Sequence, residues 1–370
     1  MKHALFAFAF GAMAATTFAQ SGGPSSASRG LTEVAGLKVG HHTLAERPTG
    51  CTVILVEGDG AVGGVSQRGG APGTRETDLL HPLNMVDRVN AIVLAGGSAF
   101  GLDSAQGVVK YLEEHNIGYK TRAGLVPIVP AAILFDLGFG NDSKTRPTAD
   151  CGYRAAQSAS DGPVGEGNVG AGAGATVGKL GGHVEHPGYP GGRRGPMKAG
   201  IGSAAIALPS GLVVSAIVAA NGVGDIIDPA SGKIVAGVRN PDGTLADART
   251  LLRSGALSVA PRAGENTTIA LVATNATLTK DQVNRMALMA DDGLARAINP
   301  SHTVGDGDTV FSLATGRWKG EVNVTVIGAL AAEALAEAIV RAAVHAETLG
   351  GVPSAREMGT IPPRFDLRRR

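Results

Sequence analysis

The stretch from Glu265 to Lys280, ENTTIALVATNATLTK, changes abruptly from polar residues to a run of β-branched and apolar ones. This composition predicts a buried strand over Thr268–Ala273. Thr279 followed by Gln282 has the spacing of a capping box, so a helix is expected to begin directly afterwards. Taken alone, the Asn266 to Thr268 triplet is an ordinary start of a strand, and it also fits a glycosylation sequon, a short pattern that recurs by chance.

The rest of the chain shows the apolar patterns of strands and of helices. Apolar runs predict further strands at Thr52–Val56, Ala91–Ala95, Ile201–Ala207, Leu212–Ala219 and Glu321–Ile327. Apolar residues at helical spacing predict helices over Gly101–His115, Arg154–Ser160, Lys280–Ile298 and Gly328–Leu349. Strands and helices alternate only loosely, so a doubly wound parallel sheet is not required. Two sheets covered by helices fit the pattern as well.

Composition limits the kinds of partner. The chain has 370 residues, of which 44% are hydrophobic and only 4% aromatic, so a core must be packed from Ala, Val, Leu and Ile. A net charge of +1 gives no overall field that would attract nucleic acid or an anionic membrane, and neither is expected as a partner. An α/β fold of this size commonly forms one domain, which we place at residues 31–370.

The N-terminus is typical of a secretory signal peptide. Lys2 and His3 precede the apolar run Ala4–Ala15, and small residues follow up to Ala19. We expect a signal peptide over residues 1–19, a flexible leader over residues 20–30, and a secreted product that is periplasmic if the host is a Gram-negative bacterium. The apolar run is too short to remain as a membrane span.

The two cysteines, Cys51 and Cys151, leave two interpretations open. In an oxidising compartment they could form a disulfide, and as two separate buried thiols they would need no partner. Neither lies in a context that would activate a thiolate nucleophile.

Glycine is densest at Gly162–Gly182, which suits a close approach of backbones or a flexible segment near a site. Within it, Ala173–Leu180 (AGATVGKL) resembles a phosphate-binding loop. Ala173 stands where that motif needs glycine and Leu180 where it needs Ser or Thr, so this interpretation is rejected.

Three other motifs carry little chemistry by themselves. Ser98 follows a strand as a nucleophile elbow would, but Phe100 occupies the place of the second glycine, which favours a turn or a substrate-facing loop. His183 and His186 lack a third metal ligand and are expected on the surface. Asp306-Gly307-Asp308 is either a turn or, if extended, a pair of carboxylates that point the same way. No metal or organic cofactor is expected.

The chain resembles the L-aminopeptidase/D-esterase family, which includes β-peptidyl aminopeptidases and the nylon-oligomer hydrolases. The resemblance runs from about Gly30 to Gly316 and rests on several stretches in order. These are Arg75–Leu80 (RETDLL), Ala95–Ala105 (AGGSAFGLDSA), Met197–Ala204 (MKAGIGSA), Ala220–Asp225 (ANGVGD), Glu265–Lys280, and Asp292–Phe311 (DGLARAINPSHTVGDGDTVF).

The resemblance implies a four-layer α/β/β/α sandwich, assembly as a homo-oligomer of αβ units, and a precursor that cuts itself before a Ser or Thr. The matching bond is Asn266–Thr267, which would give an α chain of residues 20–266 and a β chain of residues 267–370. Thr267 would then be an N-terminal nucleophile. Its own α-amine, with an unperturbed pKa of about 7.7–8.0, would serve as the base.

The resemblance also implies roles for five more residues. Asn221 matches an oxyanion-stabilising amide, and Tyr153 a tyrosine donor to the same oxygen. Lys198 matches a lysine that lowers the proton affinity of the nucleophile, and Asp306 and Asp308 an acidic pair that orients the terminal amine and Lys198. The Asp pair with Thr places the chain near the nylon-oligomer hydrolases rather than the Ser-dependent β-peptidyl aminopeptidases.

The expected function is therefore hydrolysis of small peptide or amide substrates, as an aminopeptidase or amidase. Two alternatives remain. An acyltransferase of the ornithine-acetyltransferase type would pass the acyl group to an amine instead of water. A non-catalytic exported binding protein could keep the same fold without the cut.

Overall fold

A computed structural model describes residues 28–140, 142–180, 185–186, 189–255 and 266–365. The expected signal peptide at residues 1–19 and most of the leader lie outside the described residues, as does His183. His186 belongs to a short strand.

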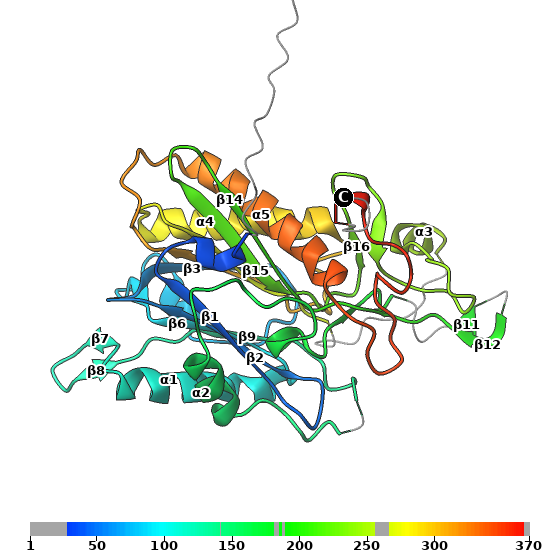
Figure 1. Ribbon diagram of the computed structural model, residues 1–370, viewed down its shortest axis with the longest axis horizontal. Coiled ribbons are helices and arrows are strands. Elements are labelled where there is room, and N and C mark those ends of the chain that lie inside the picture. The colour runs from blue at the N-terminus through cyan, green and yellow to red at the C-terminus, as the bar shows by residue number, and fades with distance from the viewer. Residues whose placement is uncertain (1–27, 141, 181–184, 187–188, 256–265, 366–370) are drawn as a thin grey trace, which may run out of the picture.

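Two sheets stacked face to face form the centre of the molecule, and a pair of helices covers each outer face (Figure 1). The four-layer α/β/β/α sandwich expected from the sequence is thus confirmed. In the first sheet the strand order is β1-β2-β6-β9-β4, and in the second it is β14-β15-β18-β20-β3-β5. The strands of the first sheet are β1 (Leu37–Thr43), β2 (Gly50–Val56), β4 (Thr74–Arg75), β6 (Ala91–Ala95) and β9 (Ala131–Ile133).

The second sheet mixes strands from both halves of the chain. Its members are β3 (Ala61–Gln67), β5 (Arg88–Val89), β14 (Ile201–Ala207), β15 (Val213–Ala219), β18 (Ile269–Thr274) and β20 (Thr309–Ala314). The two central strands, β18 and β20, are parallel, and Ile269 pairs with Thr309. Their N-terminal ends therefore lie side by side, which brings the residues before Ile269 next to those before Thr309.

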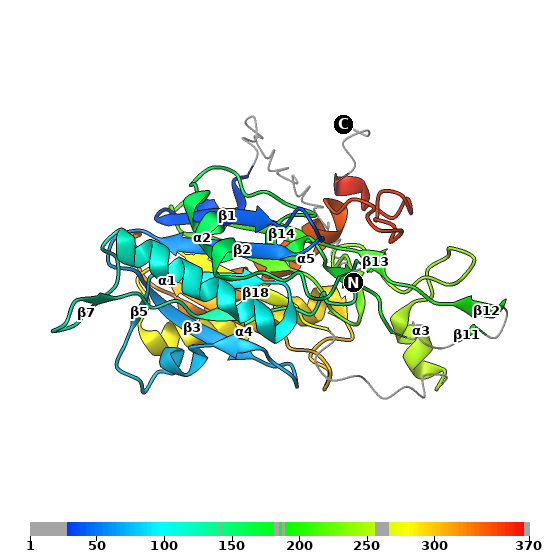
Figure 2. The same ribbon diagram turned by 90° about the horizontal axis from the view of Figure 1, so that it is seen from below.

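Helices α1 (Ser104–Glu114) and α2 (Ala149–Gln157) pack on the first sheet, and α4 (Lys280–Ala297) and α5 (Val324–Val344) on the second. Figure 2 shows α1 in front of the first sheet, with the smaller α3 (Ala248–Arg253) at the other end of the molecule. The capping box predicted from Thr279 and Gln282 is present at the start of α4. None of the helices in the part of the chain that the structure describes is long and apolar enough to cross a membrane.

Small apolar residues fill three layers of core: between the sheets, and between each sheet and its helices. Phe311 is the only aromatic side chain among the residues that form these buried clusters. Gly202 shows why small residues are needed, since a Cβ there would overlap the backbone of α5 at Ala338 and Ala342. The low aromatic content thus allows helices and sheets to approach closely.

Short elements complete the chain. They are the strands β7 (Tyr119–Lys120), β8 (Leu125–Val126), β10 (Thr176–Val177), β11 (Glu185–His186), β12 (Tyr189–Arg193), β13 (Met197–Lys198), β16 (Asp225–Ile227), β17 (Ile234–Ala236) and β19 (Ile298–Asn299), and the 3-10 helices Gly30–Glu33, Thr77–Leu80, Ser98–Asp103, Gly170–Gly172 and Pro363–Phe365.

One expected strand is wrong. Residues 321–327 read as β because of their valines, but α5 begins at Val324. Asn323 is the N-cap of this helix, and its side-chain oxygen accepts a hydrogen bond from the N–H of Val326 at 3.1 Å. The cap and the apolar helix that follows decide the local structure against the β-branched composition.

The structure joins Cys51 to Cys151 in a disulfide, with 6.2 Å between the Cα atoms. The bond ties β2 to α2 across the first core layer. The question that the sequence left open is thereby answered in favour of pairing.

Candidate active site

Thr267 is buried at the start of β18, beside the parallel strand β20. Its N–H donates to the carbonyl oxygen of Asn221 at 3.1 Å. Its hydroxyl donates to the carbonyl oxygen of Asn266 at 2.5 Å, and the same oxygen accepts the N–H of Gly307 at 2.9 Å. The peptide bond between Asn266 and Thr267 is therefore held on both sides, with the Thr267 hydroxyl against its carbonyl group.

Gly307 lies directly against Thr267. A Cβ at this position would lie 2.8 Å from Thr267 Oγ1 and 2.7 Å from the carbonyl oxygen of Ala71, closer than real Cβ atoms come. Only glycine lets the backbone N–H approach the carbonyl oxygen of Asn266 here.

Both aspartates of the Asp306-Gly307-Asp308 motif are buried. Asp308 Oδ1 accepts the N–H of Thr268 at 2.8 Å, so it is fixed next to Thr267. Asp306 Oδ2 accepts the N–H of Thr303 at 2.9 Å and its hydroxyl at 2.7 Å, which closes a turn. The motif is thus a turn and a carboxylate pair at once.

The pKa of Asp306 lies above its ordinary value. Burial is the largest cause and the neighbouring charge of Asp308 adds to it, while the hydrogen bonds from Thr303 and the charge of Lys179 act in the opposite direction. The second oxygen of this carboxylate, Oδ1, has no hydrogen-bond partner among the described residues. A buried acceptor without a partner is unusual and is often found where a ligand or a reacting group binds.

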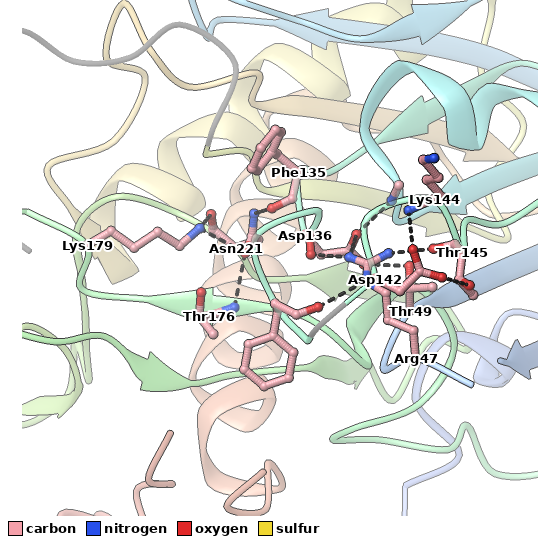
Figure 3. Close-up of polar contacts among 12 residues, drawn as sticks. Arg47, Thr49, Phe135, Asp136, Asp142, Lys144, Thr145, Thr176, Lys179 and Asn221 are labelled. Atoms are coloured by element: carbon pink, nitrogen blue, oxygen red, sulfur yellow. Dashed lines mark hydrogen bonds and ion pairs between the residues drawn. The ribbon is translucent and has the colours of Figure 1, made fainter. Parts of the chain in front are cut away.

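Asn221 follows β15 and is fully buried. Figure 3 shows its side chain between the Phe135 carbonyl, the Thr176 N–H and Lys179. Its Nδ2 donates to the carbonyl oxygen of Phe135 at 2.8 Å, and its Oδ1 accepts from Thr176 N at 3.0 Å. Its side chain is therefore fixed by neighbours, while its backbone carbonyl contacts Thr267.

Lys179 is the charged residue that the sequence did not single out. Its Nζ donates to both the backbone oxygen and Oδ1 of Asn221, each at 2.9 Å, and its charge acts on Asp306. It belongs to the AGATVGKL stretch, which is not a phosphate-binding loop. The only sequence signal was a lone lysine in the glycine-rich segment.

Among the described residues, no hydrogen bond or ion pair joins the Lys198 side chain to Thr267, Asp306 or Asp308. Its Nζ donates to the carbonyl oxygens of Ala175 and Ala199 at 2.9 and 2.7 Å, and burial lowers its pKa to about 7. The N–H of the same peptide group, which belongs to Thr176, donates to Asn221 Oδ1. Lys198 thus supports Asn221 through one peptide unit, and the lysine whose charge acts on Asp306 is Lys179.

Tyr153 is not brought to Thr267 either. It lies in α2, on the outer side of the first sheet, and its hydroxyl donates to Glu114 Oε2 at 2.7 Å. The geometry gives no support for a role as an oxyanion donor.

Within the described part of the glycine-rich segment, Gly174 packs closely against Asp136. A Cβ at Gly174 would lie 2.9 Å from Cβ of Asp136. Asp136 in turn forms a buried ion pair with Arg47 at 2.8 Å and accepts from Thr49 and from the N–H of Gly97 (Figure 3). Because Asp136 follows Phe135, this pair fixes the carbonyl group that holds Asn221. The 3-10 helix that begins at Ser98 starts at this same contact, which makes the region around Ser98 a structural turn.

Among the described residues, no group of three or more His, Cys, Asp or Glu side chains is arranged to hold a metal ion. The chemistry that these residues can perform is nucleophilic attack by a hydroxyl, assisted by carboxylates, a lysine and backbone N–H groups.

Comparisons with known proteins agree with this chemistry. The model of peptidase family S58 matches residues 29–184 and 189–356. An uncharacterized aminopeptidase of Mycobacterium leprae is 42% identical over 357 residues, 90% of this chain and 95% of the relative. A 6-aminohexanoate-oligomer endohydrolase of a Kocuria species is 30% identical over 331 residues, 83% of this chain and 84% of the relative.

Two solved structures share the fold. A β-aminopeptidase of a Burkholderia species has a TM-score of 0.66 at 24% identity and covers 90% of this chain and 92% of its own. The L-aminopeptidase D-Ala-esterase/amidase of Ochrobactrum anthropi, described as a variant of the Ntn hydrolase fold, has a TM-score of 0.64 at 19% identity, covering 90% and 95%.

The family model defines a peptidase, and these two structures show that its fold is the one described as a variant of the Ntn hydrolase fold. The chain belongs to peptidase family S58.

Proposed function

We propose that the chain is a self-processing hydrolase that cuts its own Asn266–Thr267 bond and then uses Thr267 as an N-terminal nucleophile on small peptide or amide substrates. The observation that supports this most directly is the Thr267 hydroxyl held against the Asn266 carbonyl group, with the Gly307 N–H on the same oxygen.

In the first reaction, Thr267 Oγ1 adds to the carbonyl carbon of Asn266. The developing negative charge on the carbonyl oxygen is stabilised by the N–H of Gly307. The C–N bond then breaks, the nitrogen of Thr267 takes up a proton, and an ester joins Asn266 to the threonine side chain. Water hydrolyses this ester and leaves a carboxylate on Asn266 and a free hydroxyl and amine on Thr267.

In the second reaction, the freed amine accepts the proton of Thr267 Oγ1 while that oxygen attacks a substrate amide. The amine starts from a position against the carbonyl oxygen of Asn221, which Lys179 also contacts. The unpartnered oxygen of Asp306 can accept a hydrogen bond from the resulting ammonium group. The C–N bond of the substrate then breaks, the leaving amine takes the proton from the ammonium group, and water hydrolyses the acyl-enzyme to a carboxylic acid and free Thr267.

The relatives suggest the class of substrate. Their names include an aminopeptidase and an endohydrolase of 6-aminohexanoate oligomers, both of which cleave amide bonds. We propose a small peptide or amide as the substrate, cleaved by aminopeptidase or amidase action without a cofactor.

Intact-mass analysis of purified protein tests the cut. We expect two chains, of which the smaller comprises residues 267–370 and begins Thr-Thr-Ile-Ala. Thr267→Ala should give a single uncut chain and lower amide hydrolysis at least about 1,000-fold, while Thr267→Ser should retain part of both activities. Thr268→Ala is the control at the next residue, because Thr268 is also buried and its contact with Asp308 is made by the backbone N–H, which alanine keeps. An uncut wild-type chain that stays intact for days would refute the proposal.

We also propose that the protein is exported, on the basis of residues 1–19. The disulfide between Cys51 and Cys151 supports this, because such bonds persist in oxidising compartments. Cell fractionation with N-terminal sequencing tests it: a mature chain that starts near Gln20 in the periplasmic fraction is expected, and an intact Met1 in the cytoplasm would refute it.

A further inference from the structure

His302 binds Asp308, the carboxylate fixed beside Thr267, in two ways. Its backbone N–H donates to Asp308 Oδ2 at 2.9 Å, and its ring Nδ1 lies 3.0 Å from the same oxygen. The φ angle of His302 is +54°, a left-handed conformation that side chains other than glycine adopt infrequently. This conformation accompanies the double contact of backbone and ring with one carboxylate oxygen.

A second carboxylate lies behind the imidazole. His302 Nε2 is 3.8 Å from Oδ1 of Asp291, which belongs to α4 and is completely buried. The other oxygen of Asp291 accepts a hydrogen bond from the Ser66 hydroxyl in β3. These four residues form a continuous series from β3 to the start of β18. Ser66 contacts Asp291 of α4, Asp291 faces His302, and His302 contacts Asp308.

The charges that face His302 come from three elements. Asp291 acts from α4, Asp308 from the loop before β20, and Arg68 from the end of β3. Arg68 is itself paired with the exposed Asp292 at 3.1 Å. Beyond Asp308, Asp306 is the next carboxylate and faces Lys179.

These surroundings favour a protonated imidazole. Burial lowers the pKa of His302, but the hydrogen bond to Asp308 and the charges of Asp308 and Asp291 outweigh it, so that the pKa lies above 6.5. Burial raises the pKa of Asp291 to about 6, against the effect of Ser66 and His302. Above about pH 6 the Asp291 carboxylate and the His302 imidazolium therefore carry opposite charges, until His302 loses its proton at higher pH.

We propose that Asp291 and His302 are positioning residues that hold the Asp308 side chain in place for the chemistry at Thr267. The proposal rests on the proposed function of Thr267. A protonated His302 bridges the two carboxylates, and Asp308 in turn fixes the N–H of Thr268 and with it the residue whose hydroxyl attacks. In this proposal His302 is not the base on Thr267, because its Nδ1 faces Asp308 Oδ2 at 3.0 Å.

The first experiment measures the rate of self-cleavage after cell-free synthesis between pH 5 and 9. Asp291→Asn keeps the shape of the side chain and removes its charge, so the alkaline limb of the profile should move down by about one pH unit. His302→Gln should slow cleavage about tenfold or more near pH 7 and remove that limb. A merely structural role would change the amount of folded protein and leave the profile in place.

Two variants serve as controls. Asp292→Asn changes the neighbouring carboxylate, which is exposed and points to Arg68. His41→Gln changes a half-buried imidazole of the other sheet, which is hydrogen-bonded to Thr52 Oγ1 at 2.9 Å. Both should leave the pH profile unchanged, and a shift in either equal to that of Asp291→Asn would overturn the proposal.

The second experiment does not need catalysis. In uncut Thr267→Ala protein, histidine-labelled for NMR, the pKa of His302 should lie above 6.5 and fall by about one pH unit when Asp291→Asn is added. If that variant does not fold, Ser66→Ala should move the pKa of His302 in the same direction. An unchanged pKa in a folded variant overturns the proposal even if wild type cuts itself. Absence of any cut in wild type, with the NMR shift intact, overturns the proposed function alone.

Discussion

Two buried polar clusters lie on either side of Asn221, and they differ in how completely their atoms are bonded. The Arg47–Asp136 cluster consists of Arg47, Thr49, Asp136 and the Gly97 N–H. Both oxygens of Asp136 accept hydrogen bonds, and Arg47 also donates to the carbonyl oxygens of Phe139 and Thr145, each at 2.9 Å.

The Thr267 cluster consists of Thr267, Asn221, Lys179, Asp306 and Asp308. In contrast to the first, it retains acceptors without partners among the described residues, namely Oδ1 of Asp306 and, next to Thr267, Oδ1 of Asn266. An unpaired buried polar atom costs about 1–3 kcal/mol of stability. We conclude that the first cluster supports the fold, because its acceptors are hydrogen-bonded. The second cluster has free acceptors that could bind a substrate or a reacting group.

Asp306→Asn is expected to give the largest difference between the effect on activity and the effect on stability. Amide hydrolysis by the cut enzyme should fall at least about 100-fold, because the amide of the variant cannot hold the ammonium group of the freed Thr267 as a carboxylate does. The raised pKa of Asp306 means that its contribution to stability is present below its unfolded pKa and is lost as the pH rises through the folded value. The stability of the variant relative to wild type should therefore increase as the pH rises from about 4 to 8, measured by urea unfolding. A destabilised variant with normal activity would contradict this assignment.

Replacement of the two lysines should give unequal results. Lys179→Met should slow self-cleavage about tenfold or more, because it removes the charge beside Asn221 and Asp306. Lys198→Met should affect mainly the pH dependence of stability. Burial lowers the pKa of Lys198 to about 7, so wild type should gain stability as the pH rises from about 7 toward the unfolded pKa of lysine, and this slope should be smaller in the variant. Equal loss of cleavage in both variants would contradict the distinction.

Gly307→Ala probes the contact at the Thr267 hydroxyl. The added Cβ would lie 2.8 Å from Oγ1, so Thr267 must shift and self-cleavage should slow about tenfold. Gly138→Ala is the matched control, since nothing lies within 4 Å of a Cβ there. Time courses of cutting, followed by mass, compare the two, and identical rates would show that the contact is unimportant.

The smallest effect on the reaction is expected from Arg47→Met. Removal of one partner leaves Asp136 charged and buried, which should lower the free energy of unfolding by about 3–5 kcal/mol. Cleavage per folded molecule should change only a few-fold. The double variant Arg47→Met with Asp136→Leu should recover part of the stability, as urea unfolding would show.

Local patterns predicted the elements around the site well. The strand expected at Thr268–Ala273 is β18, Ile269–Thr274, and the helix expected from Lys280 begins at that residue. In both places the period of the apolar residues and the cap agree with the tertiary structure. Strand β3 was missed because Gly63 and Gly64 interrupt its pattern. A Cβ at Gly64 would lie 2.8 Å from the backbone of α4. Glycine is needed there because the strand packs closely on a helix that lies far away in the sequence.

Four of the six predicted site residues lie together in the structure, whereas Lys179, His302 and Asp291 were not predicted. Thr267, Asn221, Asp306 and Asp308 come together around the Asn266 carbonyl group. Lys179 was missed because its partner Asn221 is 42 residues away. His302 and Asp291 were missed for the same reason, since their contact depends on how α4 packs on the second sheet. Spacing along the chain carries no signal for such pairs.

The strand order of the second sheet has a consequence for the life of the protein after the proposed cut. Strands β18 and β20 of the new chain lie between β15 and β3 of the other, so neither chain can leave without breaking a sheet on both sides. Folding must therefore precede cutting, and two separated chains would have to find each other to restore the sheet. The cut would turn a reversible folding reaction into a one-way step, after which persistence depends on the rate of unfolding rather than on an equilibrium.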